Sequence, residues 1–194
     1  MQLQDRDFLG NWRKRAVMAD HRSLANHARL FGLLLLATQP LVAFGDWRVL
    51  AQEDQTGDLT QRLAVVDSPG GERLAIFRDT EQGVYGKFKL REGLETLVPT
   101  LCPTFRVDKR RPLVLSGGED QPCKSAPNEV QFFLGTVKDG RIASPVLLQL
   151  MNGNTASFRY QLEHVGYAEA AFGLQRSKQA LAEIIGADVE VVWR

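Results

Sequence analysis

Short segments in which apolar and polar residues alternate constrain the fold of this chain more than any other sequence feature. Residues 155–162 place Ala156, Phe158, Tyr160 and Leu162 at every second position, with polar side chains between them. Successive side chains of a strand point to opposite faces, so this spacing predicts a strand with one buried face. Segments of similar pattern or of strand length lie at 47–51, 59–67, 73–78, 84–90, 104–108, 130–136 and 145–151, with 189–193 as a last strand or an ordered tail.

Turn residues separate these segments and mark where each predicted strand ends. Ser68-Pro-Gly-Gly71, Lys138-Asp-Gly-Arg141 and Asn152-Gly-Asn154 combine the residue types that tight turns favour. The Asp-Gly pair in the second of these is typical of a two-residue hairpin connection. We therefore expect short strands joined by turns, with a hairpin at Lys138–Arg141.

Residues 167–185 break the alternation and predict a helix. They are rich in Ala, Leu, Gln, Glu and Lys, which favour helices, and Gly186 suits a helix end. Leu174, Leu181 and Ile185 share one helical face, which we expect to pack on the sheet. Short strands followed by a late helix predict a mainly β fold, an antiparallel β-sandwich or a partly open barrel with one C-terminal helix.

The most hydrophobic segment, residues 30–44, follows a stretch rich in basic residues. It is shorter than the roughly 20 residues that a membrane-spanning helix needs, and Ala43 and Gly45 supply the small residues of a cleavage site. Residues 1–45 are therefore predicted to be an N-terminal extension and signal peptide, with Met18 as an alternative start that gives a leader of ordinary length. An uncleaved signal anchor and a buried core helix are the alternatives.

Composition excludes several classes of protein. The chain of 194 residues carries 24 Lys+Arg and 23 Asp+Glu, a net charge of +1, so it is neither a strongly basic nucleic-acid binder nor an acidic tail protein. Apolar residues make up 44%, which is enough for a core and too many for intrinsic disorder. We expect residues 46–194 to form a single mature β-rich domain with a net charge near −2.

Cys102 and Cys123 lie about 20 residues apart in the expected mature chain. Export places them in an oxidising compartment, where two thiols in one domain usually pair, so we predict a structural disulfide. The chain-entropy model gives such a crosslink about 3 kcal/mol of stabilisation. A reactive or metal-binding pair is the alternative, which the absence of Cys-x-x-Cys spacing and of a nearby His disfavours.

The densest basic cluster consists of Arg106, Lys109, Arg110 and Arg111, with Asp108 as the only acid within it. It follows an alternating strand and precedes a proline, which predicts an exposed turn. In a functional interpretation it contacts an anionic partner, such as lipopolysaccharide, phospholipid head groups or an acidic protein. A solvated hairpin tip is the alternative. Too few aromatic residues interleave with the cluster to favour a nucleic acid.

His164 is the only histidine of the expected mature chain and the obvious candidate for acid–base or metal chemistry. It lies between an alternating strand and the expected helix, where a surface or capping role is the alternative. Adjacent residues on a strand point apart, so Glu163 would not orient it there. The sequence has no nucleophile elbow, no phosphate-binding loop and no calcium-loop spacing. We therefore assign no catalytic residue, no metal and no cofactor.

Four sequence elements carry a resemblance to a known family. They are Asp46-Trp47-Arg48-Val49 directly after the leader, Cys102 and Cys123 around Phe105-Arg-Val-Asp108, an apolar strand pair at 130–151 around a Lys-Asp-Gly turn, and Tyr160-Gln-Leu-Glu-His-Val-Gly-Tyr167 before an Ala/Leu-rich helix. In these elements the chain resembles the invasion-associated locus B family of secreted or periplasmic bacterial proteins, although it lacks that family's early cysteines. The resemblance implies a β-sandwich at the envelope or host interface, without catalytic residues.

Together these features predict a periplasmic or secreted protein that is not an enzyme and binds a partner protein or an envelope component. After cleavage we expect no stable membrane insertion and no nucleic-acid partner. A carrier of a small ligand or lipid is the alternative, in which Phe88, Phe132, Phe158 and Tyr160 line a cavity instead of a packed core. A hydrolase that uses His164 is a further alternative.

Overall fold

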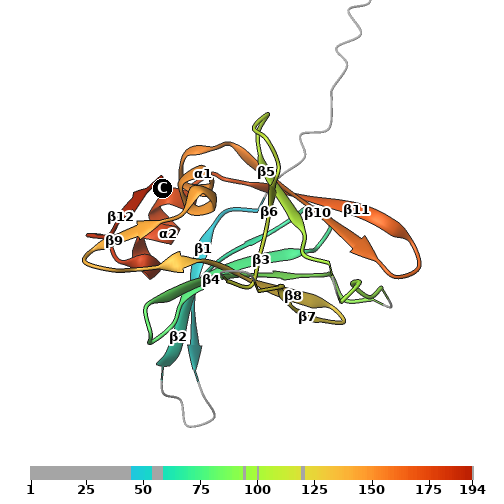
Figure 1. Cartoon of the computed structure of the whole chain (residues 1–194), viewed down its shortest axis with the longest axis horizontal. Helices are drawn as coiled ribbons and strands as arrows, with labels where there is room; N and C mark the ends of the chain where they lie inside the picture. The colour runs from blue at the N-terminus through green and yellow to red at the C-terminus, as the bar shows by residue number, and fades with distance from the viewer. Residues whose placement is uncertain (1–44, 54–58, 94, 100, 119–120, 194) are drawn as a thin grey trace, which may run out of the picture. The chain divides into compact units, whose positions relative to one another are not determined.

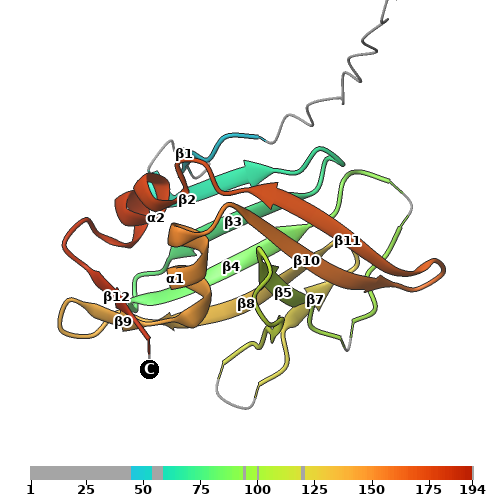
Figure 2. The ribbon, with the colours of Figure 1, turned by 90° about the horizontal axis from the view of Figure 1, so that it is seen from above.

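The computed structural model describes residues 45–53, 59–93, 95–99, 101–118 and 121–193, and Figures 1 and 2 show the ribbon from two directions. The expected leader at 1–45 lies outside these residues except for Gly45. Two facing antiparallel sheets form the body of the described chain, so the predicted mainly β, sandwich-like fold is confirmed.

The larger sheet has six strands in the order β1-β2-β3-β4-β8-β7, and every pair in it is antiparallel. At the predicted turn between the second and third strands, Ser68 Oγ accepts hydrogen bonds from the backbone N–H groups of Gly70 and Glu72, both at 3.1 Å. The strands are β1 (Arg48–Glu53), β2 (Leu59–Asp67), β3 (Arg73–Arg78), β4 (Gly83–Lys89), β7 (Lys124–Ala126) and β8 (Glu129–Thr136).

The smaller sheet has four strands in the order β11-β10-β5-β6 and lies across the larger one (Figure 2). The pairing of β10 with both neighbours is antiparallel and without a bulge. The strands are β5 (Thr104–Val107), β6 (Leu113–Val114), β10 (Thr155–Leu162) and β11 (Gly166–Gly173). The alternation at 155–162 therefore predicts both the bounds of β10 and its buried side.

Residues 145–151 form a helix, so the predicted strand there is wrong. Helix α1 (Pro145–Asn152) begins after Ser144, whose Oγ accepts a hydrogen bond from the backbone N–H of Leu147 at 3.3 Å. A proline in the first turn and a serine cap both favour a helix start. A short apolar run does not distinguish a buried strand from a buried helix, and here these local signals decide.

The helix predicted at 167–185 begins ten residues later than expected, because β11 occupies the first part. β11 pairs with β10 residue by residue, from Thr155 opposite Gly173 to Leu162 opposite Gly166. This cross-strand pairing overrides the helix propensity of the Ala-rich sequence. Leu174 consequently lies outside helix α2 (Ser177–Ile185), at its approach.

Helix α2 packs against β2 and β3 of the larger sheet and against α1, at the end of the sandwich shown in Figure 2. Leu181 and Ile185 are 0% and 1% exposed, which confirms that this helical face is buried. The chain then closes with β12 (Glu190–Val192), which pairs in parallel with β9 (Arg141–Ala143). The last of the predicted strands is thus present, and the structure adds α1 as a second helix.

The space between the sheets is filled by phenylalanine rings. Phe158 of β10 lies at the centre and packs on Phe88 of β4 with ring centroids 5.7 Å apart and ring planes 6° apart. Its other neighbours are Phe105, Phe132 and Phe172, at centroid distances of 5.3, 6.0 and 5.6 Å. These five rings are fully buried and join both sheets into one hydrophobic cluster.

The predicted disulfide joins Cys102 to Cys123, with their Cα atoms 5.5 Å apart. Cys102 lies just before β5 and Cys123 just before β7, so the bond closes the segment that leaves the larger sheet, forms β5 and β6 in the smaller sheet, and returns. The bond therefore links the two sheets covalently at the point where the chain crosses between them.

We predict that the double substitution Cys102→Ala/Cys123→Ala lowers the free energy of unfolding by about 3 kcal/mol, because it frees a closed segment in the unfolded chain. Urea unfolding at neutral pH measures the loss. Reduction of the wild-type chain by dithiothreitol should give the same value. A loss of less than about 1 kcal/mol would contradict a stabilising role for the bond.

Candidate functional site

The turn between β5 and β6 carries three of the four residues in the predicted basic cluster. Lys109, Arg110 and Arg111 are all exposed there, and the hairpin projects from the body of the molecule (Figure 1). A hydrogen bond from the Arg110 backbone N–H to the carbonyl of Val107, at 3.0 Å, closes the turn. In the described part of the chain none of the three cationic groups has an ion-pair partner.

Asp108, the one acid in the cluster, is occupied by the backbone. Its carboxylate accepts hydrogen bonds from the N–H groups of Asn154, at 3.2 and 3.3 Å, and of Thr155, at 3.0 Å. Its φ of 51° lies in the left-handed region, which Asp tolerates better than most residues. Asp108 therefore fixes the turn against the start of β10 instead of pairing with the cations beside it.

Arg106 lies apart from the other three, on β5 and on the outer face of the smaller sheet. Its guanidinium is 3.5 Å from the carboxylate of Glu169 on β11, and both side chains are about half exposed. On the same outer face, Arg159 of β10 lies over the ring of Tyr167, 4.4 Å from the ring centroid. The structure thus brings a further cation, from a segment far along the chain, to the face that continues the basic turn.

Two large apolar side chains lie exposed on this face. Val114 of β6 is 76% exposed and lies opposite Thr104, and Tyr167 of β11 is 63% exposed. We define the basic face as the five cations Arg106, Lys109, Arg110, Arg111 and Arg159 together with Val114 and Tyr167. Sequence reasoning missed Arg159, Val114 and Tyr167. Arg159 and Val114 come to lie on either side of Thr104 only through strand pairing.

His164 lies in the turn between β10 and β11 rather than at the start of a helix. Its side chain is exposed, and among the described residues it has no hydrogen bond or ion pair. The neighbouring Glu163 instead accepts a hydrogen bond from Thr96 Oγ1 at 2.7 Å. This environment supplies neither the orienting acid nor the nucleophile that the hydrolase hypothesis requires.

The rings proposed for a carrier cavity contact one another. Phe88 lies 4.8 Å from Tyr160 and 5.7 Å from Phe158 between ring centroids, and Phe132 lies 6.0 Å from Phe158. All four side chains are buried. These contacts are those of a packed core, and they lend the carrier hypothesis no support.

Tyr160 lies at the edge of this core, where its hydroxyl is 3.5 Å from a carboxylate oxygen of Glu72. Burial, and then the negative charges of Glu72 and Glu95, raise the pKa of Tyr160 to about 12. The carboxyl of Glu72 also accepts a hydrogen bond from the Ser68 hydroxyl. The same hydroxyl oxygen accepts hydrogen bonds from two backbone N–H groups. Ser68 is therefore bound into a turn and is not a free nucleophile.

Comparison of the chain with protein-family models, curated proteins and solved structures finds no match. The resemblance to the invasion-associated locus B family therefore stays a prediction. Within the described residues, no helix has the length and apolar character to cross a bilayer. The same residues include no cluster of three or more His, Cys, Asp or Glu side chains placed to hold a metal ion.

We predict that ionisation of Tyr160 destabilises the fold at alkaline pH. Because its pKa is about 12 when folded and 10 ordinarily, its contribution to the free energy of unfolding is fully present below pH 10 and is lost as the pH rises through 12. Urea unfolding should therefore show a smaller alkaline loss for Tyr160→Phe than for the wild type. Lys and Arg side chains titrate in the wild type and in the variant alike. An equal alkaline loss of unfolding free energy in the two proteins would therefore contradict this assignment.

Proposed function

We propose that this protein is an exported, disulfide-stabilised β-domain that binds a phosphate-bearing lipid surface of the bacterial envelope through its basic face. The observation that carries the proposal is the group of cations at the β5–β6 turn, which have no ion-pair partner among the described residues. Exposed apolar side chains, Val114 near the turn and Tyr167 farther along, lie on the same side of the smaller sheet. The predicted signal peptide and the disulfide support a periplasmic or secreted location.

Charge is unevenly distributed on this near-neutral chain. The basic face gathers five cations, whereas its acids are Glu169, which faces Arg106, and Asp108, which is held by backbone N–H groups. A basic side chain close to an anionic bilayer contributes about 1 kcal/mol of binding free energy. The three cations of the turn alone would therefore contribute about 3 kcal/mol.

The exposed apolar groups favour a lipid surface over a soluble anion. Val114 follows the basic turn directly on β6, and Tyr167 combines an aromatic ring with a cation stacked on it. Tyrosine rings are enriched where a bilayer meets water, and an apolar side chain beside cations gains free energy by entering the head-group region. A dissolved anion would contact the cations and leave both apolar groups in water.

We predict that Lys109→Ala/Arg110→Ala/Arg111→Ala weakens binding to vesicles of phosphatidylglycerol and phosphatidylcholine about 100-fold, because three charge contacts are lost. Sedimentation with the vesicles at low salt measures the affinity. Wild-type binding should fall as salt is raised and should be weak on vesicles of phosphatidylcholine alone.

The matched control is Lys89→Ala/Arg91→Ala/Lys124→Ala, which removes the same charge from exposed positions on or beside strands of the larger sheet. It should bind nearly as tightly as the wild type. Equal losses in the two triple variants would contradict a localised face. Displacement of the protein from vesicles by millimolar inorganic phosphate would also overturn the proposal, because it would assign the face to a free anion.

We predict that Val114→Ser weakens the same binding about fivefold, because it removes apolar area that the bilayer would cover. The slope of affinity against salt concentration should stay that of the wild type, since no charge changes. Vesicle sedimentation over a salt series measures both quantities. An unchanged affinity would show that the apolar part of the face does not enter the bilayer.

A further inference from the structure

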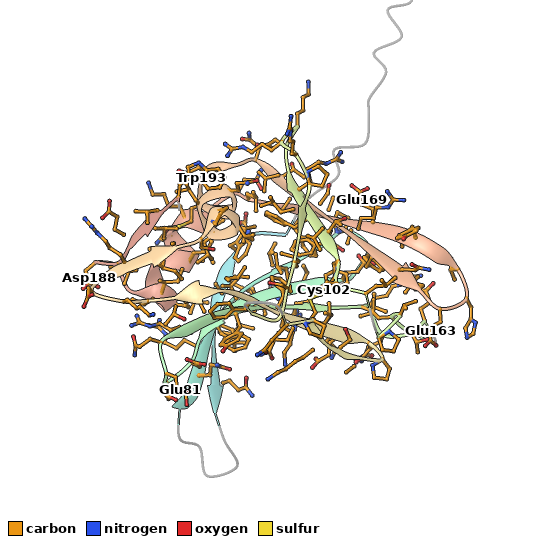
Figure 3. All side chains as sticks on the ribbon, viewed as in Figure 1. Glu81, Cys102, Glu163, Glu169, Asp188 and Trp193 are labelled. Atoms are coloured by element: carbon orange, nitrogen blue, oxygen red, sulfur yellow. A yellow bond between two sulfur atoms is a disulfide. The ribbon has the colours of Figure 1, made fainter. Side chains whose placement is uncertain are left out.

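A groove of about 560 Å³ lies over the outer face of the larger sheet, on the side of the sandwich away from the basic face. Its lining residues come from strands β4, β8 and β9, from the loop at Gly117 and Gly118, and from the turn between β8 and β9. Figure 3 shows Glu81, in the turn before β4, and Glu169, on the basic face, on opposite sides of the molecule. The groove is therefore separate from the proposed lipid-binding face.

Two aromatic rings form the floor of the groove. Tyr85 of β4 lies directly opposite Phe133 of β8, with ring centroids 5.4 Å apart and ring planes at 58°. Phe77 of β3 stacks on Tyr85 from the side, 5.7 Å away, and so fixes that ring. The register shifts beyond this pair, where Val84 lies opposite Gly135, and such bulges commonly adjust the direction of side chains at binding sites.

Polar groups without partners surround the two rings. In the described part of the chain, the side chains of Gln121, Thr136 and Lys138 have no hydrogen bond or ion pair. The wall beside them is rigid, because the Gly117 N–H donates to the Gln121 carbonyl and the Phe133 N–H donates to the Ser116 carbonyl, both at 2.8 Å. An amide, a hydroxyl and an ammonium group thus line the groove around an aromatic floor.

We infer that this groove binds a neutral oligosaccharide. A pyranose ring has an apolar face of C–H groups that stacks on aromatic rings, and hydroxyls around its edge that donate and accept hydrogen bonds. The floor of Tyr85 and Phe133 fits the first feature. The unpaired groups of Gln121, Thr136 and Lys138 fit the second.

Other ligand chemistries fit this groove less well. An acyl chain would cover the three polar side chains without satisfying them, at a cost in free energy. An anionic polymer would meet the carboxylates of Asp79 and Glu81 near the Tyr85 hydroxyl. Burial, and then these two negative charges, raise the pKa of Tyr85.

The first test is a titration of the ¹⁵N-labelled wild-type chain with maltotetraose, cellotetraose and tetra-N-acetylchitotetraose, followed by NMR. At least one of the three should shift the backbone amides of Tyr85, Gly117, Gly118 and Phe133. The inference is overturned when none of the three shifts these amides at millimolar concentration. It is equally overturned when the shifts fall on β5, β10 and β11 instead.

The second test uses variants with the oligosaccharide that binds. Phe133→Ala should weaken binding at least tenfold. Gln121→Ala, which removes an exposed side chain and keeps the backbone hydrogen bonds of the loop, should weaken it about fivefold. The control Tyr167→Ala removes an exposed aromatic ring from the opposite sheet and should leave the affinity unchanged. The triple variant of the basic turn should also bind as the wild type does, which separates this site from the lipid-binding proposal. Equal losses in Gln121→Ala and Tyr167→Ala would overturn the assignment.

Discussion

The contact between Phe158 and the rings around it holds the two sheets together, and both candidate sites depend on it. Phe158 belongs to the smaller sheet and stacks on Phe88 of the larger one. Because side chains alternate along a strand, burying Phe158 turns Arg159 outwards onto the basic face. In the same way, burying Phe132 turns Phe133 outwards into the groove. The core thus determines which residues each outer face presents.

The Cys102–Cys123 bond adds a covalent constraint to this packing. The segment that it closes contains the basic turn of Lys109–Arg111 and also the wall of the groove at Gly117 and Gly118. At one end, Asp108 fixes the segment to the start of β10, and at the other, Ser116 accepts a hydrogen bond from Phe133 of β8. A single excursion of the chain between the sheets therefore shapes a binding surface on each side of the sandwich.

Local sequence signals predicted what depends on local physics. Alternation fixed the buried side of β10, and turn residues located the β2–β3 connection and the exposed basic turn. The signals predicted the wrong secondary structure where two local preferences compete, or where pairing with a distant strand determines the conformation. Residues 145–151 are apolar enough for a strand or a buried helix. Residues 167–173 have a composition that favours a helix, but they pair with β10 and form a strand. The groove was beyond prediction, because it requires β8 to pair with β4, although three strands, β5, β6 and β7, lie between them in the sequence.

A sandwich that presents different chemistry on its two outer faces can hold two partners at once, because the core between them keeps the faces apart. The basic face gathers cations and exposed apolar groups, which suit a lipid surface. The groove combines aromatic rings with the amide of Gln121, the hydroxyl of Thr136 and the ammonium group of Lys138, which suit a chain of sugar rings. A domain bound to an anionic bilayer through the β5–β6 turn would direct its groove away from that bilayer. The near-zero net charge of the whole chain gives no sign of this difference between the two faces. The difference arises only when strand pairing brings the residues of each face together.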